Sequence, residues 1–190
     1  SVIRKVARRV VLDGRGYAGR MEWLMNLYPW EIQLTQMNLL DSHDTARAIS
    51  LCGNDAASVR LATLLLMTYP GAPCLFQGDE IGQEGGVPDY DARRPFPWQA
   101  RETWKLDVLN YHAALIALRN AEPALSVGRF VPVSEKDAPI FAFTREHDGT
   151  QLLVLINFAY RDATLALPAG FDAARWQTVL PAGVDSPLAG

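Results

Sequence analysis

The sequence predicts an α/β unit over residues 1–125 and a small all-β domain over residues 126–190. Two short apolar stretches with strand character, at 36–40 and 74–76, enclose a helix at 56–69 that is apolar on nearly all sides. A buried helix between two strands is typical of a βαβ unit with parallel strands. After Pro123 the spacing of apolar residues changes from a helical period to strand-like runs, which indicates the second domain.

Local signals set the limits of each helix in the first unit. Apolar residues at helical spacing over 21–28 predict a helix that Pro29 ends. Asp55 is placed to cap the helix at 56–69, and Pro70-Gly71 ends it. An amphipathic helix over 106–117 is the last element of the unit and stops before Pro123.

The all-β domain is predicted from alternation and a turn. Phe141 and Phe143 alternate with small or polar neighbours, and 152–156 is a continuous apolar run. Asp148-Gly149 between them is a strong two-residue hairpin signal. Further strands are predicted over 163–167 and 175–180, which completes a small all-β domain of about 60 residues.

Composition excludes several classes of function. A net charge of −3 argues against a nucleic-acid surface. The longest apolar run, at 61–67, is too short to cross a bilayer, so no membrane partner is expected. Cys52 and Cys74 make neither a metal pattern nor a disulfide framework, which favours a cytoplasmic location, and the scattered histidines predict no metal site.

The strand at 36–40 ends in the polar cluster Ser42-His43-Asp44-Thr45. Side chains at the carboxyl ends of parallel strands lie at the functional face of an α/β fold. His43 and Asp44 are therefore candidate site residues. In the structural alternative, Asp44 caps the next helix, and His43 is a polar residue whose hydrogen bonds are made within the protein.

Three ordered motifs resemble the α-amylase superfamily, glycoside hydrolase family 13. They are NLLDSHDT at 38–45, the run from Pro70 to Gly82 that contains GDEIG, and PD…RRPFPW between Pro88 and Trp98. The likeness is greatest to the neopullulanase, cyclomaltodextrinase and maltogenic amylase group. It implies that the unit is the carboxyl-terminal part of a (β/α)8 TIM barrel, with strands 7 and 8, followed by the family's β-sandwich.

The resemblance also assigns roles. Retaining glycosidases use two carboxyl groups, a nucleophile and an acid/base, about 5–5.5 Å apart. In the family these follow strands 4 and 5, and a third carboxylate after strand 7 stabilises the transition state. That third role falls on Asp44, and sugar binding falls on His43 and Arg93. The motifs of strands 3, 4 and 5 are absent from this sequence, so the chain by itself is expected to be inactive.

Other residues carry alternatives. Asp79-Glu80 are more consistent with anchoring a loop than with catalysis, and Glu84, Asp89 and Asp91 with a solvated loop. Arg93 either lines the substrate cleft or pairs with Asp89 or Asp91. The place of Arg94 stays open, and Trp98 either stacks on a sugar or anchors its loop.

The functional hypothesis is therefore a fragment of an enzyme that cleaves α-1,4, and alternatively α-1,6, bonds in maltodextrins, cyclodextrins or pullulan. A non-catalytic carbohydrate-binding or interaction module is the alternative. No cofactor is expected here, and calcium only in the preceding part of the barrel. Open sheet edges and an apolar surface predict self-association or binding to the missing amino-terminal half of the barrel.

Overall fold

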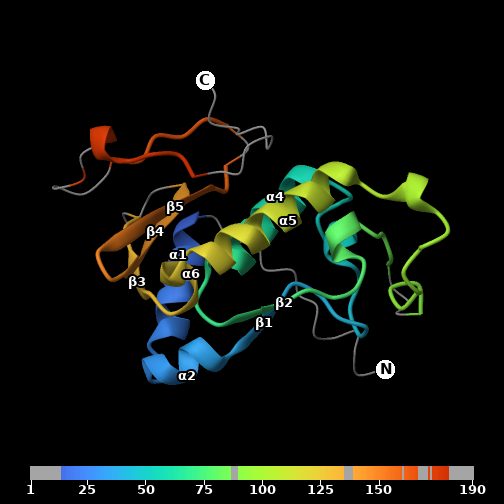
Figure 1. The fold of residues 1–190 in the computed structure, drawn as a ribbon, viewed down its shortest axis with the longest axis horizontal. Coiled ribbons are helices and arrows are strands. Elements are labelled where there is room, and N and C mark those ends of the chain that lie inside the picture. The colour runs from blue at the N-terminus through green and yellow to red at the C-terminus, as the bar shows by residue number, and fades with distance from the viewer. Residues whose placement is uncertain are drawn as a thin grey trace.

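The computed structural model describes residues 14–86, 90–134, 139–159, 161–166, 171 and 173–179. Figure 1 shows a helical part with a short parallel sheet and, beside it, an antiparallel sheet. The elements in chain order are α1 (Gly14–Met25), α2 (Trp30–Thr35), β1 (Met37–Leu39), α3 (Ala48–Leu51), α4 (Ala56–Thr68), β2 (Ala72–Cys74), α5 (Leu106–Ala121), α6 (Pro123–Ser126), β3 (Arg129–Pro132), β4 (Ile140–His147) and β5 (Thr150–Asn157), with short 3₁₀ turns at Asp79–Ile81, Arg101–Thr103 and Ala173–Arg175.

The predicted βαβ unit is confirmed. β1 and β2 are parallel neighbours, and α4 connects them. The Asp55 carboxylate accepts hydrogen bonds from the Ala57 and Ser58 amides, so the predicted cap of α4 is confirmed too. β2 begins two residues before the predicted strand, because Ala72 N–H already donates to Gln36 O across the sheet at 2.8 Å.

Gly71 makes this close approach of the two strands achievable. Its φ is +110°, and a Cβ at this position would lie 2.6 Å from Gln36 O and 2.5 Å from Asn38 Nδ2. Only glycine combines this backbone conformation with so little space. The motif that ends α4 therefore also sets the spacing between β1 and β2.

α4 and α5 run side by side along the molecule (Figure 1). Met67 from α4 packs with Tyr111 and Leu115 from α5 in a buried cluster. The buried Arg119 of α5 donates to Met67 O at 2.7 Å and to Gly71 O at 2.6 Å. Carbonyls at the end of α4 have no partner within the helix, and this guanidinium supplies one.

The antiparallel sheet has the order β3-β4-β5. The predicted hairpin at Asp148-Gly149 is confirmed, with φ of 45° and 80° at the two residues. Both φ angles are positive, as a tight two-residue turn between twisted strands requires. Phe141 and Phe143 are buried in the core of this sheet, against which Tyr17 of α1 packs.

The two further predicted strands are wrong where the structure describes them. Residues 163–166 and 176–179 are irregular, and 173–175 form a 3₁₀ turn. A strand needs a hydrogen-bonded neighbour, and none of these described residues pairs with β5. Leu167 and Leu180 lie outside the described residues. A second sheet, and the domain limits at 125 and 126, therefore stay predictions.

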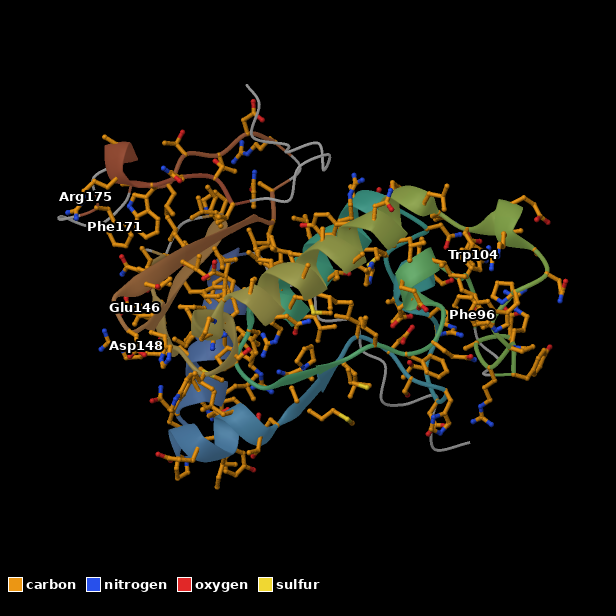
Figure 2. All side chains as sticks on the ribbon, viewed as in Figure 1. Phe96, Trp104, Glu146, Asp148, Phe171 and Arg175 are labelled. Carbon is orange, nitrogen blue, oxygen red and sulfur yellow. The ribbon has the colours of Figure 1, made fainter. Side chains whose placement is uncertain are left out.

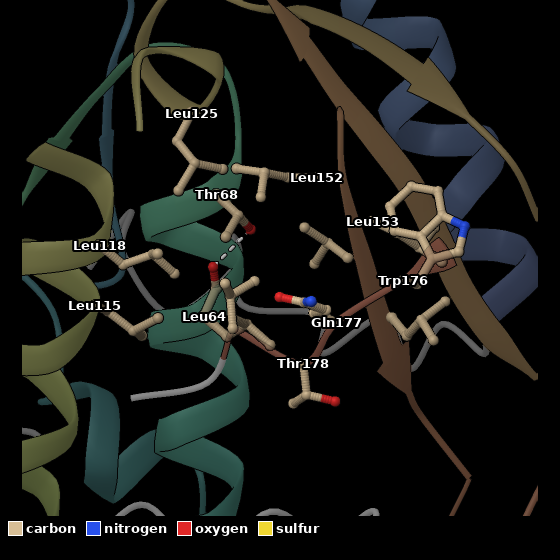
Figure 3. A pocket seen from close by; sticks show the side chains of 13 residues that line it. Leu64, Thr68, Leu115, Leu118, Leu125, Leu152, Leu153, Trp176, Gln177 and Thr178 are labelled. Atoms are coloured by element: carbon tan, nitrogen blue, oxygen red, sulfur yellow. Dashed lines mark hydrogen bonds between the residues drawn. The ribbon is translucent and has the colours of Figure 1, made fainter. Parts of the chain in front are cut away.

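The helical part and the antiparallel sheet are joined by polar and apolar contacts. Arg145 on β4 is fully buried and donates to Thr68 O at 2.6 Å, at the end of α4. Next to this contact, a cavity of about 240 Å³ lies between α4, α5 and β5 (Figure 3). Leucines from all three elements and Trp176 line it, so its walls are mainly apolar.

Exposed apolar side chains lie on β1, α1 and α2. Met37 and Leu39 on β1 are 65% and 43% exposed. Further large apolar side chains are exposed on α1, α2 and the turn between them, namely Trp23, Leu27, Tyr28 and Ile32. Among the described residues, β1 and β2 pair only with each other, which leaves a sheet edge on each of them without a neighbour. Such a surface is typical of an interface.

Candidate functional site

The loop that follows β1 presents His43 and Asp44 to solvent. A tight turn shapes it, with Thr45 N–H donating to Ser42 O at 3.2 Å and Asp44 N–H to Ser42 Oγ at 3.2 Å. The side chains of His43 and Asp44 are 65% and 68% exposed, and their Nε2 and Oδ2 atoms are 3.4 Å apart. The His-Asp pair therefore stands at the carboxyl end of a parallel strand, as the sequence predicts.

Asp44 is not the helix cap that was the structural alternative. The first amide of α3, Ala48 N–H, donates to Asp41 Oδ2 at 2.6 Å instead. Asp41 is 3% exposed and lies at the start of the loop. Because Asp41 holds the beginning of α3, the Asp44 carboxylate remains available on the surface of the loop.

Arg93 joins this site from a loop that lies fifty residues further along the chain. Its Nη2 donates to Asp44 Oδ1 at 2.8 Å, and its Nε donates to His43 O at 2.7 Å. Both the carboxylate and the backbone of the strand-end turn are thus held by one guanidinium. The three residues selected from the sequence lie together, and Arg93 pairs with Asp44.

Asp91 pairs with the next arginine, because Arg94 Nε lies 3.2 Å from Asp91 Oδ1. Arg94 Nη2 also donates to Glu84 O at 2.5 Å. Glu84 in turn forms an ion pair with Lys105 at 2.9 Å. These contacts join separate parts of the loop to one another. Asp89 lies outside the described residues.

The pair Asp79-Glu80 anchors the segment after β2, as expected. Asp79 Oδ2 accepts from Phe76 N–H at 3.2 Å, and Glu80 Oε2 accepts from Gly78 N–H at 2.7 Å. Asp79 is 6% exposed. Burial and the neighbouring Asp41 raise the pKa of Asp79 to about 8. A buried carboxyl bonded in this way has little access to a substrate.

Aromatic side chains form a small cluster on the long loop. The ring centroids of Phe96 and Trp98 are 4.3 Å apart, and Trp104 packs edge-on against Phe96 (Figure 2). Trp98 is nonetheless 63% exposed. Its contact with Phe96 is an anchor, and its free surface remains large enough for a sugar ring, so both readings of Trp98 stay open.

None of His43, Asp44 or Arg93 lines either of the two cavities that the structure shows most clearly. The first is the apolar cavity between the helices and β5 described above. The second, of about 600 Å³, lies between the segment after β2 and the long loop, with Glu84, Phe96 and Lys105 among its walls. The side chains of His43, Asp44 and Arg93 are 65%, 68% and 47% exposed, so the candidate site is open to solvent.

Across the residues that the structure describes, no group of three or more His, Cys, Asp or Glu side chains is arranged to hold a metal ion. In the same residues, no helix combines the length and the apolar character needed to span a membrane. Cys52 and Cys74 are not joined in a disulfide.

Comparison with known proteins identifies the helical part of the chain. Residues 20–105 match the family model of the α-amylase catalytic domain. This part of the chain belongs to the α-amylase family. The matched residues include both strands, the His43–Asp44 turn and Arg93, so the geometry above lies within the family's catalytic domain.

The relatives in this family carry the names of enzymes that act on α-glucans. The chain is 31% identical to a maltogenic α-amylase of Bacillus acidopullulyticus over 86% of its own length and 28% of the relative's. It is 38% identical to neopullulanase 2 of Thermoactinomyces vulgaris over 69% of its length and 22% of the relative's. The chain therefore spans about a quarter of the length of these curated relatives.

Solved structures agree with this placement. A debranching enzyme of Nostoc punctiforme, from a crystal soaked with acarbose, has a TM-score of 0.70 and 42% identity, and covers 77% of this chain and 29% of its own. A maltogenic amylase from S. marinus has a TM-score of 0.73 and 28% identity over 85% of this chain and 23% of its own. β1 and β2 accordingly correspond to part of a (β/α)8 barrel.

Asp79 was expected to anchor its loop, but Asp41 and Arg47, which form a buried group with it, were not predicted from the sequence. Arg47 is fully buried and lies within 3.7 Å of Asp79, with its guanidinium 4.1 Å from the centre of the Phe76 ring. One signal was present, since Asp41 and Asp79 each follow an apolar strand by a few residues. Their burial depends on how the two loops fold together, which no local pattern specifies.

Proposed function

We propose that this chain is the carboxyl-terminal part of a retaining glycoside hydrolase that cleaves α-1,4 or α-1,6 glucosidic bonds in α-glucans. In this proposal Asp44 stabilises the transition state in the sugar-binding subsite next to the scissile bond. His43 and Arg93 bind the same sugar. The nucleophile and the acid/base belong to preceding barrel strands that this chain does not contain.

The observation that carries the proposal is the arrangement of Asp44 and Arg93 at the end of β1. A carboxylate that bonds sugar hydroxyls must be exposed and held in one orientation, and Asp44 is both. Arg93 fixes one carboxylate oxygen, and the other lies beside His43. Oδ2 is therefore the atom placed to accept from a sugar hydroxyl.

The exposed surface of α1, α2 and β1 supports a barrel that continues beyond this chain. The relatives are about four times as long as the matched region, and a complete (β/α)8 barrel takes about 250 residues. Met37 and Leu39 would be covered by the preceding strands, which would also pair with the free sheet edge. Self-association of the isolated chain through this surface is the alternative, and sedimentation of the purified chain distinguishes the two.

Hydrolysis of maltotriose and β-cyclodextrin by the purified chain tests the proposal. No turnover is expected, because groups that act as a unit lose most of their rate when two members are absent. Asp44→Asn serves as the comparison, with Asp107→Asn, a surface aspartate on α5, as the matched control. Turnover that disappears in Asp44→Asn would contradict the claim that the catalytic pair is absent.

A non-catalytic carbohydrate-binding module is the second candidate, favoured by the exposed Trp98 beside Phe96. Calorimetric titration with acarbose and maltotriose separates the two proposals. Binding that survives Asp44→Asn but is lost in Trp98→Ala would favour the module. Binding lost in Asp44→Asn would favour the sugar subsite of an enzyme.

A further inference from the structure

We propose that Asp41 and Asp79 share a single proton beside Arg47, and that this proton holds together the two strand-end loops that position Asp44. The buried pair itself requires no glucan. Only its consequence for sugar binding rests on the function proposed above.

The geometry favours a single proton on the two carboxyl groups. Asp41 and Asp79 are 3% and 6% exposed, and each lies close enough to the other to change its pKa. Two ionised carboxylates have only acceptors to offer, so they can form a hydrogen bond to each other only when one of them is protonated. Asp41 Oδ1 is moreover buried without a protein donor, and a proton on Asp79 supplies one.

The charges around the pair agree with one proton and one negative charge. Arg47 is the only buried cation in the described part of the chain that lies against both carboxyl groups. One ionised carboxylate balances it, whereas two would leave an excess negative charge in a water-poor place. Burial and the neighbouring Asp41 raise the pKa of Asp79 to about 8, so Asp79 carries the proton at neutral pH.

Charged groups on the neighbouring elements have other partners. Glu80 accepts from Gly78 N–H, and Arg94 bonds Glu84 O. Lys105 pairs with Glu84. From α5, His112 bonds Thr63 and Val108 O, and burial lowers its pKa, so it stays neutral. None of these groups replaces the shared proton.

The cluster connects both loops of the candidate site. Asp41 holds the first amide of α3, and Arg47 N–H donates to Gly85 O at 2.8 Å. Arg47 Nη1 donates to Gln77 O at 2.6 Å, in the segment after β2. The loop that presents His43 and Asp44 is thus fixed at both ends by residues of this cluster. Loss of the proton would place two carboxylates against each other and loosen that hold.

The test is a pH titration of the aspartate side-chain carboxyl carbons by NMR in the full chain. One resonance is expected to titrate with a midpoint near pH 8, to disappear in Asp79→Asn and to persist in Asp107→Asn. If Asp79→Asn does not fold, Asp41→Asn replaces it, and the midpoint of Asp79 should then fall because the neighbouring negative charge is gone. The absence of any aspartate that titrates above pH 6 would overturn the proposal, as would persistence of that titration in a folded Asp79→Asn chain.

Acarbose binding at pH 6 and pH 9 tests the consequence for Asp44 separately. Affinity is expected to fall at least several-fold at pH 9 in the wild type and to stay level in Asp79→Asn, whose amide remains neutral. Equal affinity at both pH values would overturn the positioning role. A chain that shows the titration but binds no acarbose at either pH would instead count against the proposed function and leave the shared proton established.

Discussion

Arg145 offers the sharpest prediction about what holds the two parts of this chain together. Its side chain is fully buried on β4 and donates to Thr68 O at 2.6 Å and twice to Gly128 O, at 2.9 and 3.2 Å. Arg145→Met keeps an unbranched apolar stem and removes all three donors. Thr68 O belongs to the last turn of α4 and has no partner within the helix, so it would be left buried and unpaired.

The expected loss of stability follows from the carbonyl groups of Thr68 and Gly128, which would both lose their donors. Each buried acceptor without a partner costs about 1–3 kcal/mol. Removing a buried charge offsets part of this, since burial itself opposes that charge and lowers the pKa of Arg145 to about 10. The free energy of unfolding should therefore fall by about 2–4 kcal/mol.

Thermal unfolding followed by circular dichroism measures this loss. For a chain of this size each kcal/mol corresponds to about 2–4 °C, so Tm should fall by roughly 4–16 °C. Arg129→Met is the matched control on β3, because its ion pair with Glu146 is at the surface and is worth less than about 1 kcal/mol. A Tm for Arg145→Met within about 2 °C of that control would refute this reasoning.

Three further changes have defined outcomes. Gly71→Ala should unfold more easily than Gly53→Ala in urea by at least about 1 kcal/mol, because both have a positive φ but only Gly71 lacks room for a Cβ. Arg93→Lys should weaken acarbose binding about as much as Arg93→Ala in a calorimetric titration, since a lysine cannot hold both the turn backbone and Asp44. Unfolding should release a proton from Asp79 between pH 4 and 8, so that stability falls as pH rises through this window; urea unfolding at several pH values should show this slope in the wild type and a flatter one in Asp79→Asn.

Local signals were sufficient to predict most of the fold. The cap at Asp55, the end of α4 at Pro70-Gly71 and the hairpin at Asp148-Gly149 each depend on a few adjacent residues, and the structure confirms all three. The start of β2 was misplaced because Ala72 joins the sheet through Gln36, a residue far away in sequence. Strand limits depend on the neighbour, and the neighbour is not visible in a local pattern.

The candidate site likewise has features that the sequence predicts and features that it does not. His43 and Asp44 are adjacent in sequence at a strand end, and family resemblance added Arg93. Their meeting is confirmed by the structure, whereas their roles on a sugar remain a proposal. Arg145, which joins the two parts of the molecule, gave no signal, because an arginine inside a strand is ordinarily expected at the surface. Its burial depends on carbonyls supplied by α4 and by Gly128.

A chimeric enzyme tests the central claim most directly. The barrel of the Nostoc punctiforme debranching enzyme through its sixth strand would be joined to residues 14–190 of this chain, so that α1 is kept, and hydrolysis of maltotriose and β-cyclodextrin would be measured. We expect turnover in the chimera, and a fall of roughly 10²-fold or more in Asp44→Asn, as for loss of one transition-state contact. Asp107→Asn should leave the rate unchanged. An active chimera whose Asp44→Asn variant keeps its full rate would contradict the role given to Asp44, and turnover by residues 1–190 alone would contradict the absence of the catalytic pair.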